Sequence, residues 1–480
     1  MPARAVTPSL TMLFSAGYLA PYLLPTLVGR LTADYRLAPA AAGAIGSALL
    51  LASAAAGFTL TSRRSAGSAA ARARAGLALH IAGFALAAAA PVGALPLLVL
   101  GCLLGGAGSG TVAAVAATGI AGQHDPHRTS VRGLLLTSAV AGSLYLILPH
   151  LGGGHRLPFA CIAAWGALAL PGTGALPGTG ALTGTGQATG TTDAPLPPAG
   201  PLPLRAAGST LACCILLWSM AQNALWGVSA RIGLDRAGLS ESLLGLVFAV
   251  ALGAGLLGTA AAGTLGNRLG RALPIGAGTV AIAGCVALSA GAHSALPFAF
   301  GEIAWNGVYP FVLSYLLGLA ARLDGRGRWA VLIGSASSLG VACGPITGTL
   351  LSVSAGFTTT GLVLGAVLLL VALPMAAVAR GTDHAVARPA ARRSGLAWLG
   401  DGTSEHGGAD VWAAGSRQDH VRDGVGATRF RPTLHRRGGL ATARRARRRP
   451  GAGDRGLRPA QGGGPPRAAA GTGRADAGRP

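Results

Sequence analysis

Residues 95–121 read LPLLVLGCLLGGAGSGTVAAVAATGIA and contain no charged side chain. A hydrocarbon core about 30 Å thick is crossed by about 20 apolar residues in helical form, so this stretch predicts a membrane span. Eleven other stretches of the chain have the same character. The spans are expected near residues 9–29, 40–60, 75–94, 95–121, 132–150, 157–171, 207–230, 240–264, 272–292, 296–320, 329–352 and 357–379.

The expected fold is therefore an all-α membrane protein with twelve transmembrane helices, because the stretches are too long for the strands of a membrane barrel. The composition agrees, since charged residues make up only 11% of the chain, against about 25% in soluble domains. All six cysteines fall inside apolar stretches, which predicts neither a disulfide framework nor a metal site. We expect no cofactor.

The basic residues of the chain are all arginines, and they follow the expected topology. Of the 19 arginines in residues 1–380, 14 lie on the side of the spans that carries the N-terminus and five on the other. By the positive-inside rule, both termini are predicted to be cytoplasmic, with the chain in the plasma membrane. The net charge of +23 therefore reads as a topology signal, and no nucleic-acid partner is expected.

A Gly/Pro/Thr-rich segment divides the spans into two sets of six. It contains ALPGTG, ALPGTG and ALTGTG in tandem and predicts a flexible cytoplasmic linker over residues 171–206. The linker separates an N-terminal six-helix bundle, residues 1–170, from a C-terminal one, residues 207–380. Residues 381–480 are rich in Arg, Gly and Pro and predict a disordered tail. Attraction of anionic lipid by this tail, and a reading-frame shift near Arg380, are further hypotheses.

The loop after the eighth expected span carries a recognisable motif, Gly263-Thr264-Leu265-Gly266-Asn267-Arg268-Leu269-Gly270-Arg271. Together with the six-plus-six layout, it resembles the G-x-L-x-D-R-x-G-R signature of the major facilitator superfamily. The resemblance implies a secondary transporter of twelve helices and makes this loop a conformational element, not a substrate site. Asn267 stands where the family usually has an acid, and the corresponding loop of the first bundle keeps arginines but little else of the motif.

Two features disfavour a proton-driven drug exporter within that family. Cys102 occupies the position in the fourth span where such antiporters tend to carry an arginine. Their G-x-x-x-G-P-x-x-G signature is also missing from the fifth span. The glycine-rich stretches that remain are typical of close helix packing.

Glu302 is the one carboxylate that the pattern places well inside a span. A charge at that depth costs roughly 3 kcal/mol and usually faces partners or a water-filled cavity, so the side chain is expected to face the bundle interior. Trp305, Asn306 and Tyr309 follow on the same helical face. The resemblance places this helix tenth, among those that line the central cavity. Proton coupling, recognition of a cationic group and a structural hydrogen-bonding role all remain open for Glu302.

The seventh and first spans carry similar aromatic and polar faces. A ligand pocket combines apolar contact area with a few hydrogen-bonding groups, whereas aromatic residues near span ends also form interfacial belts. The candidates for contact with a solute on these two spans are Trp218, Gln222, Asn223, Trp226, Tyr18 and Tyr22.

These observations predict a monomeric secondary transporter that moves a small organic solute by alternating access, with protons as a candidate coupling ion. The alternative is a non-transporting membrane sensor or scaffold with the same bundle. A membrane enzyme is not expected, because no cluster of catalytic groups stands out. The sequence leaves the substrate, the coupling ion and the direction of transport open.

Overall fold

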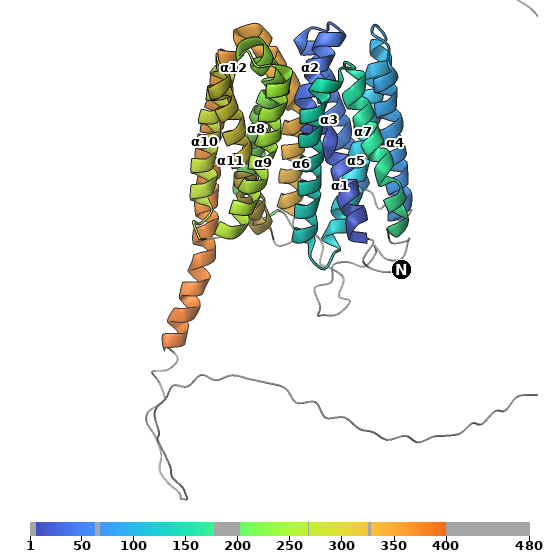
Figure 1. Ribbon diagram of the computed structural model, residues 1–480. Coiled ribbons are helices and arrows are strands. Elements are labelled where there is room, and N and C mark those ends of the chain that lie inside the picture. The colour runs from blue at the N-terminus through green and yellow to red at the C-terminus, as the bar shows by residue number, and fades with distance from the viewer. Residues whose placement is uncertain (1–5, 63–67, 177–201, 267, 325–327, 400–480) are drawn as a thin grey trace, which may run out of the picture. The chain divides into compact units, whose positions relative to one another are not determined.

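The computed structural model describes residues 6–62, 68–176, 202–266, 268–324 and 328–399, and these residues are almost entirely helical (Figure 1). The N-terminal half of the bundle contains seven α-helices and a short 3₁₀ helix. They are α1 (Val6–Tyr22), α2 (Leu24–Asp34), α3 (Pro39–Ser62), α4 (Ala69–Ala89), α5 (Leu95–Ala121), α6 (Pro126–Leu151), α7 (Arg156–Ala169) and η2 (Pro171–Ala175).

The C-terminal half contains five α-helices and one turn of π-helix. They are α8 (Arg205–Arg231), η3 (Ile232–Arg236), α9 (Glu241–Leu265), α10 (Ala272–Gly291), α11 (Ala295–Leu323) and α12 (Arg328–Leu399). Helix α12 consists of two helical rods, one before and one after Gly356, where the backbone is non-helical with φ 79° and ψ 167°. Its second rod runs beyond Arg380, where the sequence had suggested the start of the tail.

The prediction of twelve transmembrane helices is confirmed. Nine helices in the described residues are long and apolar enough to cross a membrane, or ten if α1 and α2, bent by 46°, form one broken span. Pro21 and Pro25 flank that bend, as expected of residues that interrupt helical hydrogen bonding. The second rod of α12 and the more polar α4 complete the set, and α7 continues into η2 to lengthen the sixth span.

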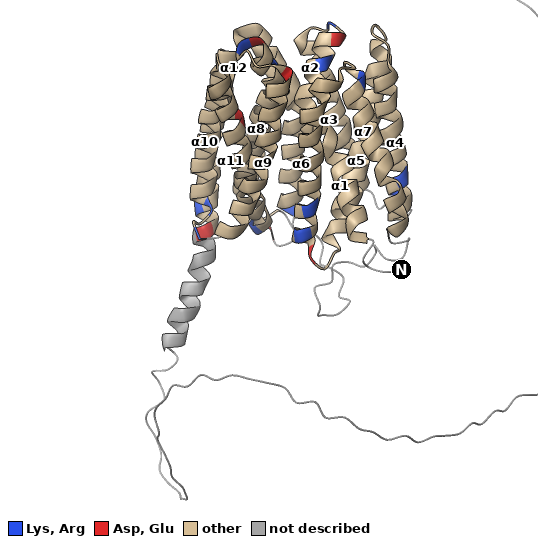
Figure 2. Cartoon of the chain, in the orientation of Figure 1, with Lys and Arg blue, Asp and Glu red and all other residues tan. Residues whose placement is uncertain are grey.

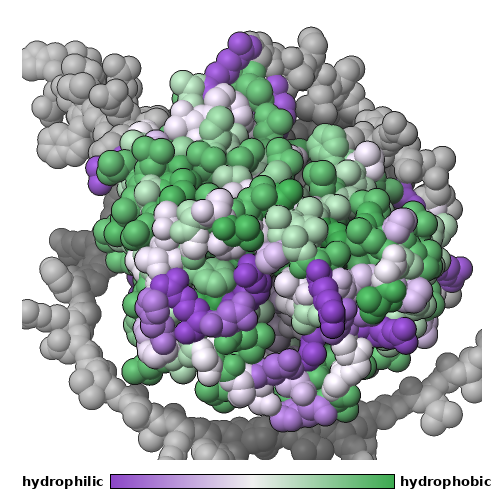
Figure 3. Space-filling model, turned by 90° about the horizontal axis from the view of Figure 1, so that it is seen from above, coloured by the Kyte–Doolittle hydropathy of each residue, from purple (hydrophilic) through white to green (hydrophobic). Residues whose placement is uncertain are grey.

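Charged residues lie mainly at the two ends of the helices and are sparse between them (Figure 2). We call the end at which α1 begins the N-terminal face and the opposite end the far face. The far face carries the end of α2, the start of α7 and the start of α9. Seen from above, it bears hydrophilic patches between hydrophobic areas (Figure 3).

The two halves pack against each other through α3 with α12, α6 with α9 and α2 with α8. At the α6–α9 contact, a Cβ on Gly245 would collide with the carbonyl oxygen of Tyr145, so only glycine permits this approach. At the α3–α12 contact, the amide of Ile346 donates to the hydroxyl of Ser47 at 3.0 Å. Both contacts lie in the part of the bundle nearer the far face.

The apolar core of the described residues consists of two clusters of buried side chains. One large cluster of buried side chains runs through both halves and includes Leu24, Tyr145 and Phe248. A smaller cluster, which includes Leu13, Leu77 and Val112, belongs to the N-terminal half alone. The shared core therefore joins the halves, while the second core stabilises one half on its own.

Candidate functional site

Glu302, on α11, is fully buried and hydrogen-bonded on both carboxylate oxygens. The hydroxyls of Ser229 on α8 and Ser289 on α10 approach Oε1 at 2.8 and 2.6 Å. The indole Nε1 of Trp305 donates to Oε2 at 3.2 Å. Among the described residues, Glu302 makes no ion pair. It is thus a buried acid held by neutral donors inside the C-terminal half.

The hydroxyl of Ser229 gives this acid two ways to be satisfied. Its oxygen lies 3.0 Å from the carbonyl of Leu225 and 2.8 Å from Glu302 Oε1. A hydroxyl has one proton to donate and lone pairs to accept. It donates to an ionised Glu302, whereas it donates to Leu225 and accepts from a protonated Glu302. Rotation of one hydroxyl therefore accommodates both protonation states without movement of the heavy atoms.

Trp305 and Trp226 connect Glu302 to the N-terminal half. Their rings meet edge to face with centroids 5.9 Å apart. The indole Nε1 of Trp226 donates to the carbonyl of Pro21 on α1 at 3.2 Å. Its ring also packs on Phe248, which contacts Tyr145 of the N-terminal half. A series of direct contacts thus runs from the buried acid to the interface between the halves.

A stacked pair of rings lies beside this series. Tyr309 stacks on Trp218 at 5.2 Å with an interplanar angle of 17°. The amide of Gln222 donates to the carbonyl of Trp218 at 3.0 Å. The side-chain oxygen of Gln222 and the indole Nε1 of Trp218 are buried and have no hydrogen-bond partner among the described residues. A buried acceptor and a buried donor without partners among the described residues therefore lie next to the stacked rings.

The other sequence candidates lie around this cluster with different degrees of exposure. Asn306 and Asn223 are partly exposed, and each amide donates to a carbonyl four residues earlier, Glu302 at 3.0 Å and Ser219 at 2.9 Å. Tyr22 shares a side-chain hydrogen bond with Ser138, and both Tyr22 and Tyr18 lie near Tyr309. Tyr18 is 39% exposed. The aromatic candidates from α1, α8 and α11 are therefore neighbours.

The loop motif between α9 and α10 forms a turn at the N-terminal face. Gly266 and Gly270 both adopt positive φ, 50° and 64°, which glycine adopts without strain. The hydroxyl of Tyr315 donates to the carbonyl of Gly266 at 2.7 Å. Arg271 pairs with Asp383 of the second rod of α12 at 3.0 Å. Arg268 and Gly263 belong to the same segment, and Asn267 lies outside the described residues.

Sequence reasoning missed several partners of these residues. Ser229 and Ser289 carry no signal of their own, because serine occurs throughout the spans. His80 is fully buried within α4 and contacts Ser109 and the carbonyl of Ile162. The described residues contain no group of three or more His, Cys, Asp or Glu side chains that could hold a metal ion.

The fold is that of a multi-pass membrane protein with twelve α-helices in its described residues. Solved structures of transporters share its architecture. The human organic anion transporter MFSD10 (TETRAN) is 16% identical, covers 78% of this chain and 100% of its own, and superposes with a TM-score of 0.58. A D-xylose–proton symporter is 15% identical over 78% of this chain and 97% of its own, with a TM-score of 0.61.

The nucleoside transporter NupG gives a third comparison, at 14% identity over 78% of this chain and 99% of its own, with a TM-score of 0.58. No protein-family model and no curated protein matches the chain. These likenesses confirm the fold predicted from the spans and the loop motif. At identities of 14–16%, these likenesses show a shared fold only. The function has to be argued from the residues of this chain.

Proposed function

We propose that this chain is a secondary transporter whose two six-helix halves give alternate access to a solute site between them. The observation that carries the proposal is the distribution of contacts between the halves. The hydrogen bonds Trp226–Pro21 and Ile346–Ser47 and the ion pair Arg30–Glu241 all lie from mid-bundle to the far face. A bundle joined on one side can open there while the other side closes.

The arginine distribution indicates which side of the membrane the N-terminal face and the far face lie on. Most of the arginines in the membrane domain lie on the side of the N-terminal face, which the positive-inside rule places in the cytoplasm. The far face is then extracellular, with the chain in the plasma membrane. The arrangement of contacts corresponds to a state closed toward the outside, and a single chain is sufficient for this cycle.

The solute site is the aromatic cluster of α1, α8 and α11. Trp218, Trp226, Trp305, Tyr309, Tyr18 and Tyr22 supply ring surfaces, and Gln222, Asn223 and Asn306 supply amides. Glu302 is enclosed by its own hydrogen bonds. The cluster therefore suits a small organic solute bound by ring contacts and by hydrogen bonds to neutral groups.

Glu302 is the proton-coupling residue in this proposal. A charge buried in a membrane without a counter-charge is unstable, which favours uptake of a proton, and the rotating Ser229 hydroxyl satisfies the acid in either state. The contacts through Trp305 and Trp226 reach Pro21 in the other half. Gain or loss of a proton thus acts next to the contacts that close the far side.

The test uses the full chain reconstituted in liposomes with an imposed pH gradient. A thermal-shift screen of organic solutes first selects a ligand, because a ligand stabilises the state that it binds. Transport predicts accumulation of that solute when the gradient is present and slower, non-concentrative exchange when it is collapsed. Protein that binds the ligand but moves none in either condition is a sensor or scaffold, and the proposal fails.

Gln222→Ala provides the matched site variant. It removes the buried acceptor beside the Trp218–Tyr309 stack and should weaken solute binding by roughly fivefold to tenfold, the effect of about one hydrogen bond. Ser335→Ala serves as its control, because Ser335 is partly exposed and bonds only to the carbonyl of Val331 among the described residues. Equal solute affinity in the two variants would place the binding site elsewhere.

A further inference from the structure

A shallow groove lies on the outside of the bundle, between α4 and α7, away from the aromatic cluster. It has a volume of about 590 Å³ and is lined mostly by small side chains, among them Ala85, Ala89, Ala160 and Ala163. These residues belong to the ends of α4 and α7 that meet the far face. Because the surrounding medium at this depth is the bilayer, the groove opens to lipid.

Arg156 stands at the mouth of the groove, at the first residue of α7. The residue is exposed, and its guanidinium has no ion pair or side-chain hydrogen bond among the described residues. The N-terminus of α7 adds its partial positive charge to the same place. The apolar groove thus has the positively charged side chain of Arg156 at the end that lies at the level of the lipid headgroups.

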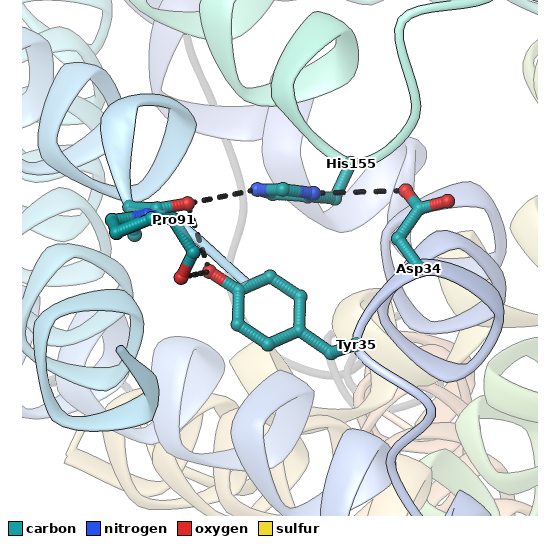
Figure 4. A network of polar contacts seen from close by, with 5 residues as sticks. Asp34, Tyr35, Pro91 and His155 are labelled. Atoms are coloured by element: carbon teal, nitrogen blue, oxygen red, sulfur yellow. Dashed lines mark hydrogen bonds and ion pairs between the residues drawn. The ribbon is translucent and has the colours of Figure 1, made fainter. Parts of the chain in front are cut away.

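The residues just before Arg156 fix the direction in which it points. His155 lies between Asp34 at the end of α2 and the turn after α4 (Figure 4). Its Nδ1 is 3.6 Å from Asp34 Oδ2, and its Nε2 is 3.2 Å from the carbonyl of Ala90. The hydroxyl of Tyr35 reaches the carbonyls of Ala90 and Pro91 at 2.9 and 3.1 Å.

This network turns His155 inward, where it is 3% exposed, and leaves its neighbour Arg156 outside. Tyr35 packs on the His155 ring at 4.7 Å. Burial raises the pKa of the Tyr35 phenol, and the positive charge of nearby Arg156 opposes that rise. Three separate segments, α2, the α4–α5 turn and the start of α7, therefore hold the mouth of the groove in place.

We propose that the groove between α4 and α7 binds one phospholipid with an anionic headgroup, its phosphate at Arg156 and one acyl chain along the alanines. The volume of about 590 Å³ lies within the range of specific small-molecule sites, about 300–1,000 Å³. From Arg156 to Ala163 the α7 wall extends roughly 10 Å into the membrane, so it accommodates the upper part of an acyl chain.

The choice of an anionic lipid rests on charge. A basic residue near the membrane surface contributes an attraction worth about a fivefold preference for anionic lipid. Zwitterionic phosphatidylcholine fills the same groove but offers Arg156 no net charge. The site is independent of the solute site, since the groove is formed by α4 and α7 and shares no residue with the aromatic cluster of α1, α8 and α11.

The experiment is photolabelling of the full chain in liposomes that contain trace amounts of a phospholipid with a diazirine in its acyl chain. Phosphatidylglycerol and phosphatidylcholine with identical chains are compared, and labelled peptides are mapped by mass spectrometry. We expect phosphatidylglycerol to label the peptides of α4 and α7 that line the groove about five times more than phosphatidylcholine does.

Two variants separate the headgroup contact from the groove. Arg156→Gln should reduce labelling by phosphatidylglycerol to the level of phosphatidylcholine, whereas Arg132→Gln, an equal loss of charge near the N-terminal face, should not. Ala160→Phe fills the groove and should suppress labelling by both lipids, whereas Ala167→Phe adds the same ring to an exposed position deeper on α7. A phosphatidylglycerol preference that survives in Arg156→Gln, or undiminished labelling in Ala160→Phe, overturns the proposal.

Discussion

Each half of the bundle buries one titratable side chain against a serine of a neighbouring helix, yet the two sites differ in what they reach. In the N-terminal half, His80 of α4 contacts Ser109 of α5 at 3.0 Å. In the C-terminal half, Glu302 of α11 contacts Ser229 of α8 at 2.8 Å. Both serines also donate to, or lie within reach of, a carbonyl four residues earlier in their own helix.

His80 and Glu302 differ in the residues that surround them. His80 bonds to the carbonyl of Ile162 and packs edge to face on Phe84, so every contact stays within the N-terminal half. Glu302 bonds to Trp305, and from Trp305 the contacts continue through Trp226 to Pro21 in the other half. Both side chains are buried, so burial does not distinguish them. We propose proton coupling for Glu302 because, of the two, only its contacts lead to the interface between the halves.

The largest effect is expected from Glu302→Gln. An amide keeps the size and most of the hydrogen bonds of the acid but neither takes up nor releases a proton. Uptake driven by a pH gradient should fall to the level of protein-free liposomes, while exchange of solute without a gradient persists. Both fluxes are measured in the same proteoliposomes. Gradient-driven uptake at the wild-type rate would remove Glu302 from the mechanism.

His80 should behave in the opposite way. His80→Leu leaves Ser109 and the carbonyl of Ile162 with one partner fewer in a buried place, at a cost of about 1–3 kcal/mol. The unfolding temperature should drop, while the remaining folded protein keeps its gradient-driven uptake. His80→Gln restores a donor and should recover part of the stability. Loss of gradient dependence in folded His80→Leu protein would show that both halves carry a coupling group.

The sequence predicted the fold well because the bilayer imposes length and polarity on every span. The twelve spans were visible as patterns, whereas the bend of 46° between α1 and α2 was not predicted. Glu302 stood out for the same reason, since a carboxylate is rare among apolar residues. Its partners did not, because Ser229 and Ser289 are ordinary residues whose role depends on which helices pack together.

The sequence pattern also did not predict contacts between segments that are far apart in the chain. The bond from Trp226 to Pro21 joins residues on α8 and α1, and its partner is a backbone carbonyl that any residue could supply. Which titratable group reaches the interface is decided by tertiary packing, and the sequence alone does not give it.

A change at Trp226 tests the link between Glu302 and the interface. Trp226→Phe keeps a ring against Trp305 but removes the donor to Pro21, which should favour opening of the far side by about 1 kcal/mol, or about fivefold. The readout is labelling of a cysteine at position 249, where Ala249 packs near Gly142 of the N-terminal half, in a background without the native cysteines.

The pH dependence of that labelling distinguishes a link from a simple loss of packing. With Trp226 present, labelling should change with pH, and Glu302→Gln should abolish the change. In Trp226→Phe, labelling should be higher at every pH and less sensitive to pH. If its pH response equals that of the parent protein, the contacts through Trp226 do not carry the coupling, and Glu302 reaches the interface by another route.

The smallest effect is expected at the ion pair between Arg30 of α2 and Glu241 of α9, which joins the halves at the far face with a separation of 2.6 Å. The Glu241 side chain is 50% exposed, and exposed pairs contribute about 0–1 kcal/mol. Arg30→Gln or Glu241→Gln should therefore raise labelling at position 249 by less than about fivefold.

High salt should mimic the effect in the parent protein and leave the variants unchanged. Exchanging the two charges, Arg30→Glu with Glu241→Arg, should restore the parent value, because the attraction depends on the pair and not on which half carries the cation. Failure of the exchanged pair to restore it would mean that one of the two residues acts through a partner other than the opposite charge.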